Sequence, residues 1–313
     1  MRLLFVFIDG VGLGEDVDSN PFVYTSTPGL SRLLSGHKLI SSTVNYQDSK
    51  TSLLALDATL GIPGLPQSAT GQATIFTGEN AAAFLGQHLR GFPNQLLRGL
   101  IAAKTVYKSL RKEGYRVAFA NAYRPKFFEW LDRGLPGSFY SCSTLAAFYG
   151  GLSFYNLSDI IDRKALYMDI TNETLQPHCD KVPVLTPDEG AAQLINIHKE
   201  FDFCLFEFFL SDIIGHMADY TEAGNIVKIL DSFLSGLAER INIDEEMLII
   251  TSDHGNMEDI TGREHTLNKV PLLIVGEQGL RRQISGNLNS LCDLVPAIKD
   301  ILAANARNEN SEM

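Results

Sequence analysis

The chain has 313 residues, of which 45% are hydrophobic and 20% are charged, a composition typical of a globular protein with a sizeable core. With 26 basic and 37 acidic residues its net charge is −11, which disfavours nucleic acids and anionic membranes as partners. No apolar run approaches the roughly 20 residues of a membrane span. Four scattered cysteines without a CxxC pair argue against a disulfide framework or a thiolate zinc site. The apolar start is too short for a signal peptide, so we expect a cytoplasmic protein.

Short runs that are apolar throughout predict strands buried on both faces. In chain order they are "LLFVFI" (3–8), "RVAFANA" (116–122), "FDFCLFEFF" (201–209), "EMLIIT" (246–251) and "VPLLIVG" (270–276). Segments with helical patterns lie between or beside them, at 28–36, 94–114, 187–201 and 223–242. The alternation predicts one α/β domain over residues 1–313, with a doubly wound, mostly parallel sheet flanked by helices.

Residues 135–180 break this rhythm. The stretch is rich in aromatic residues, Gly and Ser, and it has little periodicity. We predict that it forms a small, irregular, lid-like insertion within the domain.

Ionisable residues follow three of the predicted strands. Asp9 ends the first run, Asp212 lies just beyond the run at 201–209, and Asp253 follows the run at 246–251. In an open α/β sheet the ligand site lies outside the carboxyl ends of the strands, so these carboxylates should meet at one edge. A single Asp there is more often a turn or capping residue. Three of them, accompanied by nearby histidines, favour a functional site; the histidines are His216, His254 and His265.

This set of side chains is suited to metal ions. Carboxylate and imidazole donors without thiolates fit manganese or zinc. Carboxylates packed together without a cation would repel one another and raise each other's pKa. Three Asp and three His are enough for two divalent ions that share one site.

A candidate nucleophile precedes a predicted helix in "GLPQSATGQATIFTGE" (64–79). A hydroxyl at a helix N-terminus lies beside free N–H groups and the positive end of the helix dipole, which favours phosphate. On this stretch alone, an N-cap role for Ser68 is the simpler interpretation. Beside a metal centre the same hydroxyl would be activated as a nucleophile.

These motifs resemble those of the alkaline phosphatase superfamily, and within it the cofactor-independent phosphoglycerate mutase and phosphopentomutase branch. "FVFIDGVGLGEDVDSNPF" is similar to the opening strand and metal-binding Asp of that branch, and "GLPQSATGQ" is similar to its nucleophile segment. "SDIIGHMAD", "TSDHGNMED" and "HTLNKVPLLIVG" resemble its remaining metal-binding motifs. The branch usually has a His where this chain has Gln72.

The resemblance implies an alkaline phosphatase-like core with two metal ions. It places Asp212, His216 and His265 on one ion, and it places Asp9, Ser68, Asp253 and His254 on the other. It also makes Ser68 the catalytic nucleophile, with Thr70 as a second choice. Only 144 positions separate Ser68 from Asp212, so the large inserted domain of the mutases is missing or much reduced. The substrate-binding candidates are Thr70, Gly71, Arg124 and Lys126.

We therefore expect a metal-dependent phosphatase or phosphodiesterase that hydrolyses a small phosphate ester. One alternative is a phosphomutase acting on phosphoglycerate or a sugar phosphate. An alternative of another class is an inactive metal-binding module, although none of the expected ligand positions is lost. A sulfatase-like enzyme is disfavoured because "SATGQ" lacks the Arg that such a nucleophile motif needs.

Overall fold

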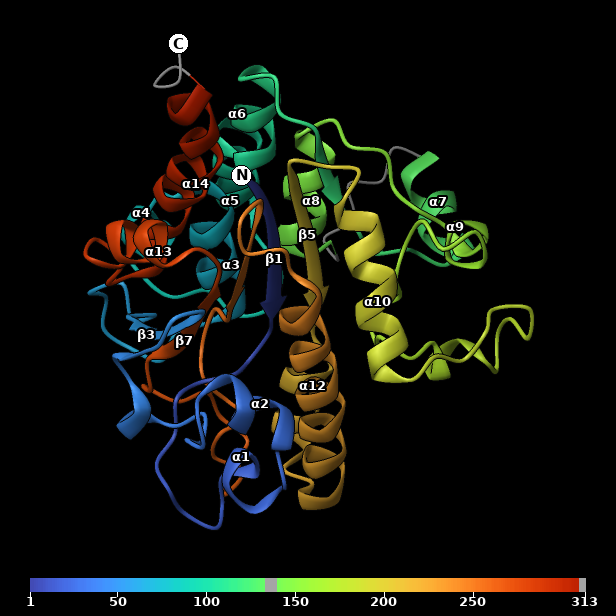
Figure 1. Ribbon diagram of the computed structural model, residues 1–313. Coiled ribbons are helices and arrows are strands. Elements are labelled where there is room, and N and C mark those ends of the chain that lie inside the picture. Colours follow the sequence, from blue (N-terminus) through green and yellow to red (C-terminus); the bar gives the residue numbers. More distant parts are fainter. Residues whose placement is uncertain (133–139, 310–313) are drawn as a thin grey trace.

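The computed structural model describes residues 1–132 and 140–309, with side chains described to residue 304 (Figure 1). All the described strands belong to one seven-stranded sheet in the order β2-β3-β7-β6-β1-β5-β4. Each of the five predicted strands is present: β1 (Arg2–Ile8), β4 (Val117–Phe119), β5 (Phe203–Phe208), β6 (Glu246–Thr251) and β7 (Val270–Val275). Two further strands, β2 (Tyr46–Gln47) and β3 (Thr51–Leu56), extend the sheet beyond β7.

The sheet is mixed, so the expectation of a mostly parallel sheet is only partly met. β1 pairs in parallel with β5 and β6, and β4 pairs in parallel with β5. The pairs β6–β7, β3–β7 and β2–β3 are antiparallel. β7 returns directly beside β6 through the loop 252–269, without the crossover helix that a parallel neighbour requires. The site expected at the carboxyl ends of β1, β5 and β6 is unaffected, because those three strands are mutually parallel.

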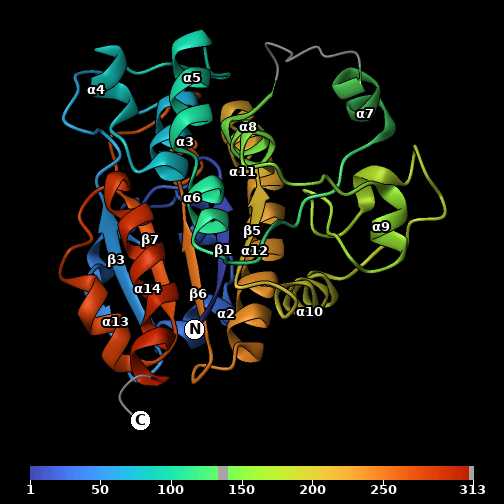
Figure 2. The same cartoon turned by 90° about the horizontal axis from the view of Figure 1, so that it is seen from above.

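Helices cover both faces of the sheet (Figures 1 and 2). Alternate side chains of β1 point to opposite faces. Phe5 packs in a core with α3 (Ser68–Thr77), α5 (Gln95–Lys104), α8 (Cys142–Tyr149) and α14 (Leu294–Glu309). Val6 packs in a second core with α2 (Pro28–Leu33), α10 (Pro187–His198) and α12 (Tyr220–Arg240). The predicted three-layer α/β architecture is therefore present.

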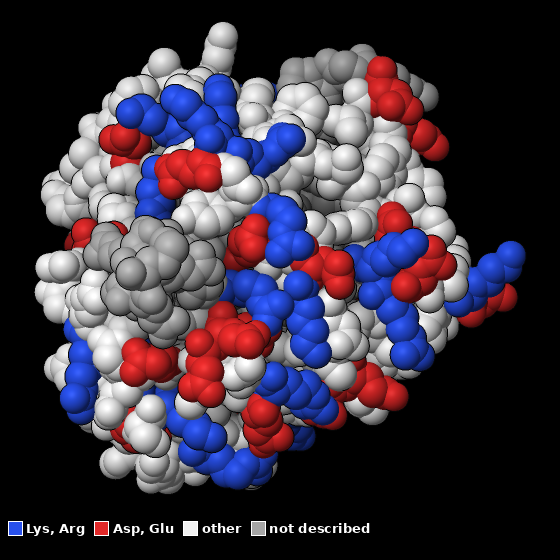
Figure 3. Space-filling model, turned by 45° about the horizontal axis from the view of Figure 1, so that its top comes forward, with Lys and Arg blue, Asp and Glu red and all other residues white. Residues whose placement is uncertain are grey.

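The remaining helices have eight residues or fewer. They are α1 (Pro21–Tyr24), α4 (Ala81–Leu85), α6 (Val106–Lys112), α7 (Pro125–Asp132), α9 (Leu157–Ile161), α11 (Leu210–Met217) and α13 (Gln278–Ser285), with 3-10 turns at Ser41–Thr43, Glu173–Leu175 and Leu291–Asp293. In the described part of the chain, none of the helices combines the length and apolarity that a bilayer span needs. Basic and acidic side chains are intermixed on the face seen in Figure 3, so the net negative charge is not gathered into one area there.

One predicted helix is wrong in its extent. Residues 94–114 form two helices, α5 and α6, that are separated at Thr105. Thr105 has an extended backbone (φ −50°, ψ 134°), and its buried hydroxyl donates a hydrogen bond to the carbonyl of Ala146 in α8. A tertiary contact therefore interrupts a sequence that is helical by local pattern.

The irregular stretch predicted at 135–180 divides into two parts. Its start falls within residues 133–139, which lie outside the described residues. α8 packs with α3 and α5 in the core that contains Phe5, which is the main core of the protein. Residues beyond it form a separate small apolar cluster that includes Ile160, Tyr167, Leu175 and Val182. α9 belongs to this part and lies to one side of the sheet, close to α7 (Figure 2).

Candidate active site

Three parallel strands deliver the predicted carboxylates to one edge of the sheet. Asp9 directly follows β1, Asp212 lies in the first turn of α11 after β5, and Asp253 follows β6. The turn after β1 passes close over Asp212, since a Cβ atom on Gly10 would lie 2.6 Å from Asp212 Oδ1. Gly10 also has φ +72°, a conformation that favours glycine. The convergence predicted from the sequence is thus present in the fold.

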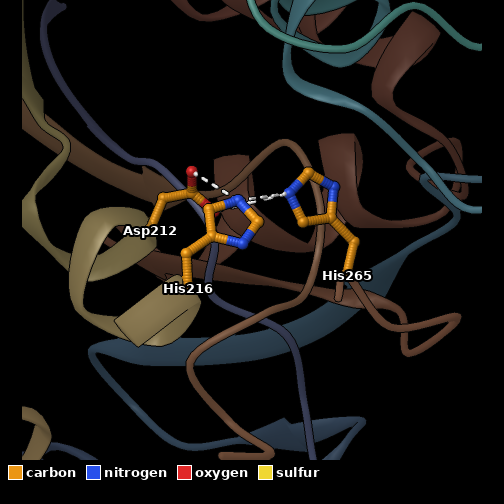
Figure 4. Close-up of side chains that lie close together, drawn as sticks. All are labelled: Asp212, His216 and His265. Carbon is orange, nitrogen blue, oxygen red and sulfur yellow. Dashed lines mark hydrogen bonds and ion pairs between the residues drawn. The ribbon is translucent and has the colours of Figure 1, made fainter. Parts of the chain in front are cut away.

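Asp212, His216 and His265 form the first group of donor atoms (Figure 4). His216 lies one helical turn after Asp212 on α11, which brings its Nε2 to 3.4 Å from Asp212 Oδ2. His265 comes from the loop before β7, and its Nε2 lies 3.2 Å from His216 Nε2 and 3.6 Å from Asp212 Oδ1. Figure 4 shows the two rings and the carboxylate directed at one another.

The other ring nitrogen of each histidine is held by a backbone carbonyl. His216 Nδ1 lies 2.7 Å from the carbonyl oxygen of Arg263, and His265 Nδ1 lies 2.7 Å from that of Pro66. A carbonyl only accepts, so in each neutral ring Nδ1 carries the proton and Nε2 presents its lone pair. Two lone pairs and a carboxylate that face one another repel unless a cation lies among them. The donor set therefore fits a divalent metal ion.

Asp9, Asp253 and His254 form the second part of the site. His254 Nε2 lies 3.3 Å from Asp9 Oδ1 and 3.5 Å from Asp253 Oδ2. Asp253 and His254 are fully buried, and among the described residues Asp9 Oδ1 and Asp253 Oδ2 have no hydrogen-bond donor of good geometry. Burial and the neighbouring carboxylate raise the pKa of Asp9 well above its usual range. Burial opposes protonation of His254, but Asp253 and Asp9 outweigh it and raise its pKa to about 10. Two buried carboxylates with unpaired oxygens again fit a bound cation.

The structure divides the donors differently from the prediction. The sequence resemblance assigns Asp212 to the first ion alone. In the structure its carboxylate also lies within 4.8 Å of donor atoms of Asp9 and His254. The two groups of donor atoms therefore share the carboxylate of Asp212.

Ser68 is the first residue of α3 and faces this cluster. The N-cap of α3 is Gln67, so Ser68 does not play the capping role that is the simpler interpretation of the sequence. Its Oγ shares a 2.9 Å hydrogen bond with His254 Nε2. The first turn of α3 lies against the backbone after β6, because a Cβ atom on Gly71 would be 2.8 Å from the Asp253 carbonyl oxygen. The absence of a side chain at Gly71 allows the helix N-terminus to reach the site.

Of the four predicted substrate-binding residues, Arg124 and Lys126 line the cavity, whereas Thr70 and Gly71 do not. The Thr70 hydroxyl is fully buried and donates to the Gln67 carbonyl at 3.0 Å, so it is turned away from the site. Gly71 is buried against Asp253 and offers no exposed group. Arg124 and Lys126 do line the cavity next to the site, and Lys126 Nζ lies 5.1 Å from the centre of the Trp130 ring. The structure thus does not support direct substrate contacts by Thr70 or Gly71.

Several residues that support the site were not predicted. Gln72 Nε2 donates to Asp9 Oδ2 at 3.0 Å, and Asn256 Nδ2 donates to Asp212 Oδ1 at 2.7 Å. Glu258 is buried and accepts hydrogen bonds from the backbone N–H groups of Gly12 and Asn256, both at 2.8 Å. It also accepts from the side chains of Thr266 and Asn268, so it ties the loop after β1 to the loop before β7. The concentration of acids in "SDHGNMED" was the available signal for Glu258.

Glu207 is a further unpredicted group. It is the fifth residue of β5 and lines the same cavity as Asp9 and Ser68. The pKa of Glu207 is raised to about 8, chiefly by burial. The Ser143 hydroxyl donates to Oε2 at 2.7 Å and lowers the pKa, whereas the charge of Asp9 raises it. The carboxyl is therefore mostly protonated at neutral pH. An acidic residue within an apolar strand was the signal that the sequence offered.

A cavity of about 530 Å³ opens beside the carboxylate and hydroxyl groups. Asp9, Ser68, Gln72, Glu207 and Asp212 lie on one part of its wall. The opposite part comes from α7, from the residues after β4, and from α8 and its N-cap. Its size falls in the range typical of sites for small molecules.

The chain matches known proteins in both sequence and fold. Residues 145–306 match the family model described as the Metalloenzyme superfamily. Curated relatives include 2,3-bisphosphoglycerate-independent phosphoglycerate mutases from Antithamnion sp., 30% identical over 137 residues (40% of this chain, 27% of the relative), and from Desulforudis audaxviator (strain MP104C), 33% identical over 135 residues (39% and 26%). The matched region thus spans about a quarter of the length of these relatives.

Solved structures share the architecture at low sequence identity. The PH0037 protein from Pyrococcus horikoshii has a TM-score of 0.57 at 15% identity, with 96% of each chain covered. The alkaline phosphatase from the Antarctic bacterium TAB5 has a TM-score of 0.50 at 11% identity, with 96% of this chain and 98% of that one covered. At these identities the likeness concerns the fold alone.

Proposed function

The chain belongs to the metalloenzyme superfamily, whose fold is alkaline phosphatase-like, and on that premise we propose that it hydrolyses a small phosphate ester through Ser68. One observation carries the proposal. A serine hydroxyl at a helix N-terminus lies 2.9 Å from His254 Nε2, beside a buried cluster of carboxylate and imidazole donors and at the wall of a cavity. Phosphoryl transfer needs this combination of nucleophile, charge stabilisation and substrate space.

Two divalent cations, manganese or zinc, fit the donor set. Asp212, His216 and His265 would hold one ion, and Asp9, Ser68, Asp253 and His254 would hold the other, with Asp212 close to both. When bound, such ions would draw charge from the phosphoryl oxygens and favour the ionised form of the serine hydroxyl. Asn256 and Gln72 orient the carboxylates of Asp212 and Asp9 by donating hydrogen bonds to them.

The residues of the chain account for both halves of a hydrolytic cycle. The Ser68 hydroxyl gives up its proton to solvent, its Oγ attacks phosphorus, the bond to the ester oxygen breaks, and the leaving oxygen takes up a proton. Glu207 lines the cavity and is mostly protonated at neutral pH, so it is placed to donate that proton. Water then attacks the phosphoserine, which releases inorganic phosphate and restores the serine. The N-terminal N–H groups of α3 favour the negative charge of the phosphoryl group in both steps.

Hydrolysis is favoured over mutase chemistry by the architecture between Ser68 and Asp212. A mutase must retain its dephosphorylated intermediate and exclude water until the phosphate returns. In the described part of the chain, the residues between α3 and β5 add helices and one edge strand, and they form no second sheet. The counterargument is that the matching curated relatives are named phosphoglycerate mutases, so a phosphomutase is the second candidate.

The products formed from a small panel of esters distinguish the two functions. Purified protein with added manganese or zinc is incubated with phosphoglycerates, pentose phosphates and aryl phosphates. Hydrolysis predicts steady release of inorganic phosphate without an isomerised product. Isomerised glycerate or pentose phosphate without free phosphate would establish the mutase function, and Ser68→Ala protein controls for contaminating phosphatases.

A further inference from the structure

The far wall of the cavity is built from aromatic side chains. They come from the segment after β4, from α7 and from the residues around α8 and α9, and the main ones are Tyr123, Phe127, Trp130, Tyr140 and Tyr167. Tyr140 and Tyr167 are buried, and Trp130 is half-buried. Aromatic faces of this kind bind flat, unsaturated groups by stacking and by removal of apolar surface from water.

The aromatic wall is pre-formed. The rings of Tyr123 and Phe127 are stacked with centroids 3.9 Å apart, and Phe127 also contacts Tyr140 at 5.6 Å and Phe154 at 5.0 Å. The Tyr123 hydroxyl shares a 2.7 Å hydrogen bond with Thr144 Oγ1 on α8, which links this cluster to the main core. Since the rings support one another, little ordering entropy is lost when a ligand stacks on them.

The polar side chains of the cavity are largely occupied by one another. The side-chain amide of Asn121 bonds to both the backbone N–H and the carbonyl of Glu207. The Ser141 hydroxyl bonds to Ser143 and Thr144, and Gln72 donates to Asp9. A sugar or glycerate group carries several hydroxyls, each of which needs a partner when water is removed. Apart from the Tyr140 hydroxyl, which has no partner among the described residues, this wall offers them few, whereas a flat apolar group needs none.

The rim of the cavity combines apolar and cationic groups. Phe92 and Ile213 line it and remain 48% and 45% exposed. Arg124 and Lys126 are exposed there as well, in a protein whose net charge is −11. This rim suits an incoming molecule that carries both an apolar face and negative charge.

We propose that the substrate is a phosphate monoester whose alcohol carries a flat, apolar aryl group. The phosphate would lie at Ser68, and the aromatic group would stack against Trp130 and its neighbours. This substrate class rests on the proposed function for its chemistry. Recognition of the aromatic group rests on the cavity alone, so binding and turnover can be tested separately.

Binding can be read directly because Trp130 is the single tryptophan of the chain. Its fluorescence therefore reports on the cavity without interference from other tryptophans. We would titrate the full-length protein, with manganese or zinc added, with benzylphosphonate and with cyclohexylmethylphosphonate. The two have similar size and charge, but only the first is flat and aromatic. We expect the benzyl compound to bind about tenfold more tightly, a stacking preference of ordinary size. Equal affinity, or no fluorescence change at ligand concentrations that calorimetry shows to be saturating, would overturn the proposal.

Two variants of one helix provide a matched comparison by calorimetry. Trp130 and Phe128 are both half-buried aromatic residues of α7 packed against the main core, but of the two only Trp130 lines the cavity. Trp130→Leu should abolish the benzyl preference and Trp130→Phe should restore most of it, whereas Phe128→Leu should leave it unchanged. Loss of the preference in Phe128→Leu but not in Trp130→Leu would contradict the proposed stacking site.

Turnover separates this inference from the proposed function. Benzyl phosphate and cyclohexylmethyl phosphate have alcohols of similar basicity, so a ratio of kcat/KM in favour of the benzyl ester reports recognition. Phosphate release from both esters at equal kcat/KM, with equal phosphonate affinity, would refute the aromatic site and leave the hydrolase intact. Aromatic preference in binding without phosphate release from any ester would refute the hydrolase and leave the aromatic site intact. A nucleoside 5′-monophosphate should bind less tightly than benzylphosphonate, because its ribose hydroxyls would find few partners at this wall; tighter binding would contradict the preference for an apolar aryl group.

Discussion

Replacing Asp212 by Asn should lower stability with metal and change it little without metal. Its carboxylate belongs to both groups of donor atoms and lies within 4.8 Å of those of Asp9 and His254. Two unit charges at that separation repel by about 3 kcal/mol at an effective dielectric constant of about 20. His254, with its pKa raised to about 10, is protonated at neutral pH and attracts Asp212 over the same separation. Without metal this attraction offsets the repulsion from Asp9, so the net effect of Asp212→Asn on stability should be no more than about 1 kcal/mol. The amide oxygen of the variant can still accept the hydrogen bond from Asn256.

With metal the variant should be less stable than the parent, because it loses a carboxylate that would lie close to both ions. An ion at about 100 times its dissociation constant stabilises the protein by about 2.7 kcal/mol. For 313 residues the unfolding entropy is about 0.7 kcal/mol/K, so each ion should raise the melting temperature by about 4 °C. Tenfold weaker binding removes about 1.4 kcal/mol of that gain for each ion.

Thermal unfolding in a chelator and in excess manganese or zinc measures both effects. Asp212→Asn should melt within about 1–2 °C of the parent protein in chelator and well below it in metal. Asp244→Asn is the control, because Asp244 is exposed and its removal changes net charge equally. A variant whose melting temperature rises with metal as much as that of the parent would show that Asp212 is not a metal ligand.

Two further changes test the supporting carboxylates. Because Glu207 has its pKa raised from 4.5 to about 8 in the folded chain, metal-free protein should lose up to about 5 kcal/mol of stability as pH rises between these values. Between pH 5 and pH 8 in urea, the loss should be about 3–4 kcal/mol larger in the parent than in Glu207→Gln, because the raised pKa values of Asp9 and His254 act in both proteins. An equal loss in the two proteins would show that Glu207 does not contribute. Glu258→Gln should lower the free energy of unfolding by about 2–4 kcal/mol. The NH₂ group of the amide would face two of the groups that now donate hydrogen bonds to the carboxylate. A variant with unchanged urea midpoint would mean that these loops are held by other contacts.

The sequence predicted best those features that depend on residues close to one another in the chain. The strands β1, β5, β6 and β7 are apolar throughout because both faces are covered, and this pattern is readable without the fold. Asp9 and Asp253 could be placed at one edge because parallel strands end together. The position of His216 beside Asp212 could be predicted because the two residues are one helical turn apart.

Features that depend on distant contacts were less predictable. β3 consists of Thr, Ser, Leu and Ala, residues with little β preference apart from Thr, and it forms a strand by pairing with β7. The sharing of Asp212 between two donor groups depends on how α11 lies against the loop after β1. The aromatic wall joins residues from several segments between 121 and 168 that have no common periodicity.

The central claim is that the phosphoryl group passes through Ser68, and the most direct test is detection of a phosphoserine there. Protein with manganese or zinc is mixed with benzyl phosphate, quenched in acid within the first turnover, digested and examined by mass spectrometry. The account predicts one added phosphoryl group on Ser68 in the peptide that contains "QSATGQ". Ser68→Ala protein should give neither the modified peptide nor phosphate release. Undiminished phosphate release by Ser68→Ala protein would contradict the account.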